Sequence, residues 1–217
     1  MSSANKWLPH VVTAIIIALC RFAANVSAQE LTYNERTVES LVILRHAELQ
    51  PRGLGQLSCR GLNRALMLPG ILLPKYGRPT AIFAPDPSQK IHEHGGNYSY
   101  VRALATIEPT AIKAELPVDA EIGYRNINDL QKQLMQPQYW NATVYICWEH
   151  QMLETFTRDL IRSFRGNVKI VPAWKGSNFD RIYVLRIIRR KNVATLQFQI
   201  AQEDLTGYLS ASCPDGR

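Results

Sequence analysis

The chain has 217 residues, of which 46% are apolar and 20% are charged. This composition excludes collagen-like, low-complexity and intrinsically disordered proteins, and the length suits one globular domain. Lysine and arginine outnumber aspartate and glutamate by 25 to 18, which favours anionic partners without distinguishing nucleic acid, acidic lipid and phosphorylated small molecules. Four cysteines at unrelated spacings exclude a dense disulfide scaffold, and the lack of a Cys-x-x-Cys pair gives no indication of a zinc site.

The first 28 residues have the three parts of a secretory signal peptide. A short polar start carries Lys6, an apolar segment covers residues 8–20, and small residues at Val26 and Ala28 resemble a cleavage site. The alternative is an uncleaved membrane anchor, but this segment would rise only about 20 Å as a helix, against about 30 Å for the hydrocarbon core. We therefore predict cleavage after Ala28, which leaves residues 29–217 as a secreted or periplasmic domain with no stable membrane insertion.

Cleavage would also remove Cys20 and leave three cysteines in an oxidising compartment. Cys147 lies in an apolar run, and we expect it to be a buried free thiol. A bridge between Cys59 and Cys213 would attach the C-terminal segment to the domain, and we keep it as a hypothesis.

Strand and helix patterns alternate along the rest of the chain. The first predicted elements are a buried strand over 40–44, a helix capped by Ser58 with Leu62, Ala65, Leu66 and Leu68 on one side, and a short strand over 80–84. A polar loop over 89–98 and a helix over 100–114 follow, and Pro109 indicates a kink or a late start in that helix. The last elements are a strand over 142–148, a helix from about 149 towards 165, and two strands over 182–188 and 194–200 joined by a hairpin. This order predicts a three-layer α/β/α sandwich with a mostly parallel central sheet and a site at the carboxyl ends of its strands.

Both of the strongest predicted strands end in a histidine. The first leads into Arg45 and His46, and the later one leads into Glu149 and His150. A single histidine after a strand is more often structural than catalytic. Because the carboxyl ends of parallel strands meet in one crevice, two such histidines beside an arginine favour catalysis.

Other catalytic signatures are missing from the sequence. It contains neither a Gly-x-Ser-x-Gly nucleophile elbow nor a Gly-x-x-x-x-Gly-Lys-Ser/Thr phosphate loop. His92 and His94 lie in a glycine-rich segment, which we interpret as a solvated loop rather than a metal site. We predict no metal and no other cofactor.

Residues 44–48, Leu-Arg-His-Ala-Glu, resemble the Arg-His-Gly/Ala signature of the histidine phosphatase superfamily, the phosphoglycerate-mutase-like group. Further segments resemble that family's motifs in the same order: the helix start at 57–65, the strand at 82–84, the arginine segment at 100–106, and the strand at 144–150 that delivers a second histidine. The resemblance covers residues 38–190. It implies the family's α/β/α fold and does not select one activity within the superfamily.

The resemblance implies a role for each of these residues. His46 would be the nucleophile that forms a phosphohistidine, Arg45 and Arg102 would clamp the phosphoryl group, and His150 would stabilise charge on its oxygens. Guanidinium groups suit a clamp because they bind phosphoryl oxygens bidentately and neutralise their charge. Arg52 falls where family members often place another phosphate-contacting residue, or else it is a loop arginine. The implied activity is a metal-independent, exported phosphatase that hydrolyses a small phosphomonoester.

The sequence departs from the family pattern at three places. Ala47 replaces the commoner glycine, and residues 85–99 add extra loop before Arg102. No acid that would protonate the leaving group can be identified, and the carboxylic candidates are Glu48, Glu115, Asp119, Glu121, Asp129 and Glu149. The alternative hypothesis is therefore a catalytically inactive protein of the same fold that binds a phosphorylated ligand or a protein partner.

Several basic residues gather near the predicted C-terminal hairpin, namely Arg186, Arg189, Arg190 and Lys191. Such a cluster could bind nucleic acid or acidic lipid, but at a hairpin it is more typical of a solvated turn. We expect no nucleic-acid partner, and the oligomeric state and the molecule that carries the phosphoryl group stay open.

Overall fold

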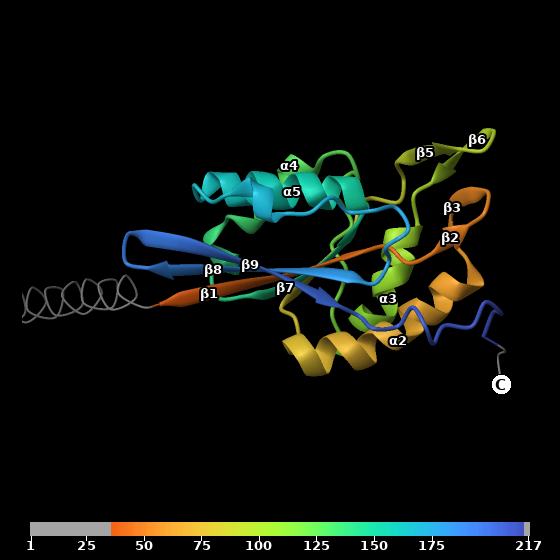
Figure 1. Cartoon of the computed structure of the whole chain (residues 1–217), viewed down its shortest axis with the longest axis horizontal. Helices are drawn as coiled ribbons and strands as arrows, with labels where there is room; N and C mark the ends of the chain where they lie inside the picture. The colour runs from red at the N-terminus through yellow and green to blue at the C-terminus, as the bar shows by residue number, and fades with distance from the viewer. Residues whose placement is uncertain (1–35, 215–217) are drawn as a thin grey trace, which may run out of the picture. The chain divides into compact units, whose positions relative to one another are not determined.

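Residues 36–214 are described by the computed structural model of the chain (Figure 1). One unit comprises Thr37–Arg189 and Ala194–Arg217, and of the remaining described residues Arg36 and Arg190–Val193 fall outside it. A five-stranded sheet runs through this unit in the order β4-β7-β1-β8-β9. Its strands are β1 (Thr37–Arg45), β4 (Ala81–Phe83), β7 (Thr143–Trp148), β8 (Arg181–Arg190) and β9 (Val193–Gln202).

Helices cover both faces of this sheet. They are α2 (Cys59–Tyr76), α3 (Arg102–Ala114), α4 (Ile127–Leu134) and α5 (His150–Ser163), with 3-10 turns at Pro137–Tyr139 and Val168–Ile170. In the view of Figure 1, α4 and α5 lie above the sheet and α2 lies below it, with α3 packed against α2 near the right-hand end of the strands. Leu68 and Leu72 of α2 and Leu153 and Leu160 of α5 are fully buried in the core. The predicted three-layer α/β/α sandwich is confirmed.

The central strands explain where a site can form. Leu41–Leu44 of β1 are 0–1% exposed, as expected for a strand that is covered on both faces. β1 and β4 each pair in parallel with β7, whereas β8 runs antiparallel to β1, so the sheet is mixed. Because β1 and β7 are parallel, Arg45 pairs with Trp148 and both strands end at the same edge of the sheet.

Helix α2 begins as the sequence predicts, but its buried side differs. The Ser58 hydroxyl caps the helix by accepting a hydrogen bond from the Gly61 N–H at 3.1 Å. Leu62 and Leu66, which were expected on the buried side, are 37% and 51% exposed. Ala65 and Leu68 are buried as expected, and Leu72 joins them, because this spacing of three and four residues keeps side chains on one helical face.

Two short hairpins and one helix were not predicted. The first hairpin joins β2 (Leu49–Gln50) to β3 (Gly53–Leu57), and the second joins β5 (Lys90–Glu93) to β6 (Gly96–Ser99). The expectation of a polar loop over 89–98 is therefore wrong. Glu93 pairs with Gly96 across a tight turn that Gly95 makes possible with a φ of +81°. Helix α4 falls where no element was expected.

The structure tests the predictions about the cysteines, and it bears on a membrane-spanning helix only within residues 36–214. Cys59 and Cys213 form a disulfide, and Cys147 is buried and free, as the sequence suggested. None of the helices within residues 36–214 is long and apolar enough to cross a membrane. The predicted signal peptide, residues 1–28, lies outside the described residues.

Candidate active site

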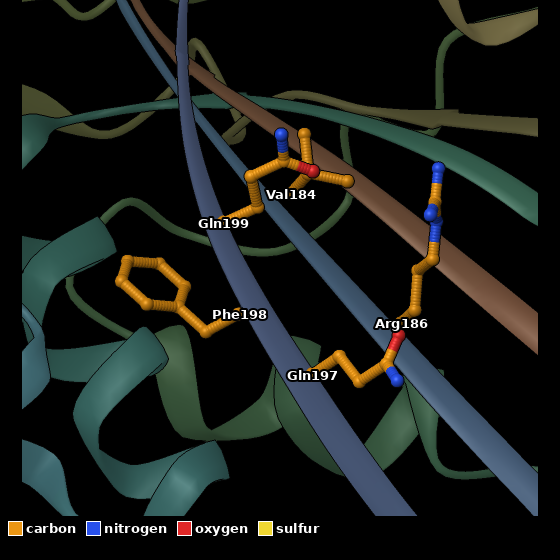
Figure 2. Close-up of a pocket in the computed structure, with 5 residues that line it drawn as sticks. All are labelled: Val184, Arg186, Gln197, Phe198 and Gln199. Carbon is orange, nitrogen blue, oxygen red and sulfur yellow. The ribbon is translucent and has the colours of Figure 1, made fainter.

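Two cavities differ sharply in the chemistry of their walls. A hollow of ≈ 320 Å³ on strands β8 and β9 is lined by Val184, Arg186, Gln197, Phe198 and Gln199 (Figure 2). Its one ionisable lining residue is Arg186, and it has no nucleophilic side chain. In Figure 2 the Phe198 ring lies on one side of its strand, and Gln197 and Arg186 lie on the other.

The second cavity, of ≈ 560 Å³, lies at the carboxyl ends of β1 and β7 and contains the ionisable groups. It is lined by Arg45, His46, Leu49, Ile91, His92, Arg102, Tyr124, Arg125, Glu149, His150, Gln151 and Met152. The four residues that the sequence singled out as catalytic all belong to this wall. Three arginines and three histidines face one carboxylate, so the cavity suits an anionic ligand.

His46 directly follows β1 and is anchored between the two parallel strands. Its backbone N–H donates to the Trp148 carbonyl of β7 at 3.0 Å, and its side chain is 2% exposed. The ring Nδ1 lies 2.7 Å from the Ala47 carbonyl oxygen. A carbonyl can only accept a hydrogen bond, so Nδ1 carries the proton and Nε2 keeps its lone pair.

The electrostatic surroundings keep this imidazole neutral. Burial lowers the pKa of His46 well below its ordinary value, and the positive charges of Arg45 and Arg102 lower it further. Rings of Tyr100 and Phe179 lie against it, each with a centroid 6.1 Å away. His46 is therefore neutral and oriented at physiological pH, and a lone pair on Nε2 is available to accept a proton or to attack an electrophile.

Arg45 is the last residue of β1 and is 4% exposed. Its Nη1 donates to the Gly176 carbonyl at 2.5 Å, and its guanidinium lies 3.9 Å from the centre of the Phe179 ring. Its Nε is buried and has no hydrogen-bond partner. Burial lowers the pKa of Arg45 to about 10, opposed by the Glu149 carboxylate, so the side chain stays a cation at neutral pH.

Arg102 opens helix α3 and is also 4% exposed. Its Nη2 forms an ion pair with Glu93 Oε1 at 2.7 Å, while Nε and Nη1 are buried without a hydrogen-bond partner. The Thr106 hydroxyl ties this helix to the loop after β1, because it donates to the Arg102 carbonyl at 2.7 Å and accepts from the Ala47 N–H at 2.9 Å. The arginine and the histidine are thus held in one framework.

His150 is the first residue of α5, and Glu149 caps that helix. The Glu149 carboxylate accepts a hydrogen bond from the Met152 N–H at 2.9 Å. Its other oxygen lies 2.6 Å from His150 Nδ1, close enough for an ion pair although the angles are not those of a hydrogen bond. Burial alone would raise the pKa of Glu149, but the contact with His150 and the helix N–H groups lower it below its ordinary value, so this carboxyl is ionised.

Most of the other candidates lie away from the cavity. Arg52 is exposed in the turn between β2 and β3 and is not among the lining residues. Of the six candidate acids, only Glu149 lines the cavity. Glu48 pairs with Arg64 at 2.8 Å, Asp119 accepts from Gln133 at 3.0 Å, and Asp129 pairs with Lys132 at 2.9 Å. Glu115 is an exposed helix cap beside Arg78, and Glu121 is exposed.

Sequence reasoning missed several residues of this cavity. His92, interpreted as part of a solvated loop, is exposed but lines the cavity from β5. Tyr124 and Arg125 lie just before α4, and the Arg125 Nε donates to the Tyr124 hydroxyl at 2.8 Å. The residues that follow them in the sequence gave one signal. Ile127, Leu130 and Leu134 have helical spacing, which predicts a helix directly after Arg125.

Metal ligands do not gather in the part of the chain that the structure describes. Within residues 36–214, no group of three or more histidine, cysteine, aspartate or glutamate side chains could hold a metal ion.

Comparisons with known proteins found matches among solved structures. No known family profile and no curated protein matches the sequence. Solved structures that match include a mycobacterial glucosyl-3-phosphoglycerate phosphatase, which is 13% identical with a TM-score of 0.49 over 76% of this chain and 98% of that one. A phosphoserine phosphatase variant from Entamoeba histolytica, in complex with phosphoserine, is 14% identical with a TM-score of 0.46 over 78% and 99%.

A phosphoglycerate mutase from Plasmodium falciparum is 11% identical with a TM-score of 0.45 over 74% of this chain and 89% of that one. These matches are histidine phosphatases and phosphoglycerate-mutase-like proteins. Since all three TM-scores are below 0.5 and the identities are low, the case for a function rests on the side chains of this chain.

Proposed function

We propose that this protein is a phosphatase that hydrolyses small phosphomonoesters through a phosphohistidine on His46. The observation that carries the proposal is the set of buried guanidinium donors without partners beside a neutral imidazole. A buried donor that lacks an acceptor costs free energy, and phosphoryl oxygens would supply the acceptors that Arg45 and Arg102 lack. The same oxygens would bring the phosphorus atom to His46.

The protonation of His46 supports a particular first step. With its proton on Nδ1, the ring would attack phosphorus through Nε2. The Nε2–P bond would form while the bond from phosphorus to the leaving oxygen breaks, and that oxygen would take the electron pair. Water would then attack the phosphorus, break the Nε2–P bond and release inorganic phosphate.

The cationic groups would stabilise the charge that spreads over the phosphoryl oxygens. Arg45 and Arg102 come from two different elements, so they would hold the group from two sides. His150 lines the same cavity with its Nδ1 2.6 Å from the Glu149 carboxylate, and it would contact the same group. Positioning and electrostatic stabilisation of this kind account for most of the catalysis in phosphoryl transfer.

The leaving group sets a limit on the substrate. Among the described residues, the one carboxyl that lines the cavity is Glu149, and it is ionised and committed to the start of α5. It therefore has no proton to give to a departing alkoxide. We propose that substrates whose leaving groups are stable anions, such as aryl phosphates, are hydrolysed fastest.

Export forms part of this proposal. The Cys59–Cys213 disulfide supports it, since such bonds persist in oxidising compartments. Expression of the full chain in a secreting host, followed by N-terminal sequencing, tests it. A mature protein that begins at residue 29 is expected, and retention of residues 1–28 on a cytoplasmic protein would contradict it.

Hydrolysis of an aryl phosphate, with and without a chelator, tests the activity. We expect turnover that the chelator does not change and that is lost in His46→Ala. His94→Ala is the matched control, because His94 is exposed and does not line the cavity. Binding of phosphate without any turnover would favour the alternative of an inactive ligand-binding protein, and full activity of His46→Ala would eliminate the proposed mechanism.

A further inference from the structure

Glu93 is the carboxylate that contacts Arg102, and it lies outside the cavity's lining. Glu93 Oε1 is 2.7 Å from Arg102 Nη2, and the two side chains are 13% and 5% exposed. This ion pair occupies one nitrogen of the guanidinium and leaves Nε and Nη1 without partners. Arg102 is thus fixed through Nη2, while Nε and Nη1 can still bind a ligand.

Glu93 is itself fixed by the neighbouring hairpin. Its second oxygen accepts a hydrogen bond from the Gly55 N–H at 2.8 Å, and β3 lies against both β5 and β6. Gly53 and Gly55 have φ angles of +77° and +66°. A Cβ at Gly53 would overlap Glu93 Oε2, and a Cβ at Gly55 would overlap the Ser99 carbonyl oxygen. Both glycines are therefore required for the approach of the β2–β3 hairpin to the segment that carries Glu93.

The chemistry of a buried arginine explains why such a contact matters. A free arginine side chain has several rotatable bonds, so a phosphoryl site built on it needs something that restricts its rotamers. A charge-assisted hydrogen bond from a carboxylate does this with a defined direction. Burial would raise the pKa of Glu93, but the bonds from Arg102 and the Gly55 N–H lower it below its ordinary value, so the carboxylate is charged.

We infer that Glu93 is a positioning residue for Arg102, which holds the guanidinium so that its free nitrogens meet the phosphoryl group. This inference rests on the proposed function of the cavity. Glu93 lies on β5, inside the segment 85–99 by which the sequence departs from the family pattern. The added hairpin thus has a function in the site rather than only at its rim.

The affinity for inorganic phosphate, measured by calorimetry, tests the inference without requiring turnover. We expect Glu93→Ala to weaken phosphate binding about tenfold, because a displaced guanidinium loses its geometry. Glu93→Gln keeps an oxygen acceptor for Arg102 and should remain within about threefold of the wild type. Glu108→Ala is the matched control, since Glu108 is an exposed carboxylate on the same helix as Arg102.

A double-mutant cycle separates positioning from a merely structural role. If Glu93 acts through Arg102, then Glu93→Ala should cause no further loss of phosphate affinity in an Arg102→Ala background. An equal loss in both backgrounds, or no loss in the single variant, would overturn the inference. Should Glu93→Ala fail to fold, Glu93→Asp, which keeps the charge but shortens the side chain, replaces it with the same expectation.

The outcomes for positioning and for catalysis can be told apart. If the protein binds phosphate in a manner that depends on Glu93 but hydrolyses no aryl phosphate, the positioning role stands and the proposed function fails. If it hydrolyses the aryl phosphate and Glu93→Ala binds phosphate as the wild type does, the function stands and the positioning role fails. A wild-type protein that does not bind phosphate would overturn both.

Discussion

Two groups of buried arginines carry the same charge in opposite surroundings. Arg64 is fully buried, and its guanidinium contacts three carboxylates, those of Glu48, Asp180 and Glu203. Arg45 and Arg102 are almost as buried, yet both keep donors without a partner. A buried cation whose donors are satisfied belongs to the fold, whereas unsatisfied donors at a cavity indicate a site for an anion. Burial alone therefore does not distinguish a structural arginine from a ligand-binding one. The number of hydrogen-bond acceptors around its guanidinium does.

Arg64→Met should give the largest effect on stability. It would leave three carboxylates around one buried position without their cation, which costs about 3–5 kcal/mol. For a domain of this size the melting temperature should fall by on the order of 10 °C. Thermal and denaturant unfolding measure this loss. Arg60→Met is the control, because Arg60 is more exposed and contacts only Glu48 among these carboxylates, at 3.4 Å. Equal stability of Arg64→Met and the wild type would contradict the structural role of Arg64.

Arg102→Met should reverse the pattern seen for Arg64. We expect kcat/KM for an aryl phosphate to fall by about 10²–10³, the usual effect of losing one electrostatic contact to the reacting group. Stability should fall far less than in Arg64→Met, since among the described residues Glu93 is the one carboxylate that loses its ion pair and the Tyr100 ring loses one cation–π contact. Steady-state kinetics and unfolding of the same preparation measure both quantities. A stability loss as large as that of Arg64→Met, with turnover retained, would show that Arg102 is structural.

Reduction of the Cys59–Cys213 disulfide should weaken the fold around Arg64. The bond links residues 154 positions apart and attaches the segment after Glu203 to α2. Its loss should destabilise the protein by about 2–4 kcal/mol. Melting with and without reductant measures this, and any turnover by the folded protein should change little. A Cys147→Ala variant should respond to reductant like the wild type, because Cys147 is a free thiol. If reductant leaves the melting temperature of the wild type unchanged, the prediction is contradicted.

The pH dependence of catalysis should give the smallest and most specific effect. Burial, followed by Arg45 and Arg102, lowers the pKa of His46, so the neutral form that the proposed mechanism requires persists below the ordinary histidine value. Activity should therefore be lost only as the pH falls through that lowered pKa. Arg102→Met removes one positive neighbour and should move the acid limb of kcat/KM to higher pH. NMR titration of His46 checks the assignment, and an unchanged limb would contradict it.

The part of the site that lies on regular strands was predictable from the sequence. The apolar runs at 41–44 and 144–148 predict buried strands, and parallel strands place their carboxyl ends at one edge. His46 and His150 directly follow those runs, so their approach to one another follows from the fold class. The disulfide between Cys59 and Cys213 was only a hypothesis from the sequence, and the structure contains it.

The contacts that adjust the site were not predictable in the same way. Glu93 lies in a polar segment whose side chains do not alternate between apolar and polar, so neither its strand nor its bond to Arg102 left a periodic signal. The partners of Arg64 come from positions 48, 180 and 203, which only the tertiary structure brings together. Long-range pairing of charges has no local pattern, which explains why the six candidate acids could not be ranked before the structure was known.

The most direct test of the account is to trap the phosphoenzyme. The protein is mixed rapidly with an aryl phosphate, quenched without acid and digested. Peptide mass spectrometry should then find one phosphoryl group on His46. The same experiment on His46→Ala should find none, and its turnover should be lost. Hydrolysis that proceeds with no phosphorylated protein, or with the phosphoryl group on a different residue, would contradict the central claim.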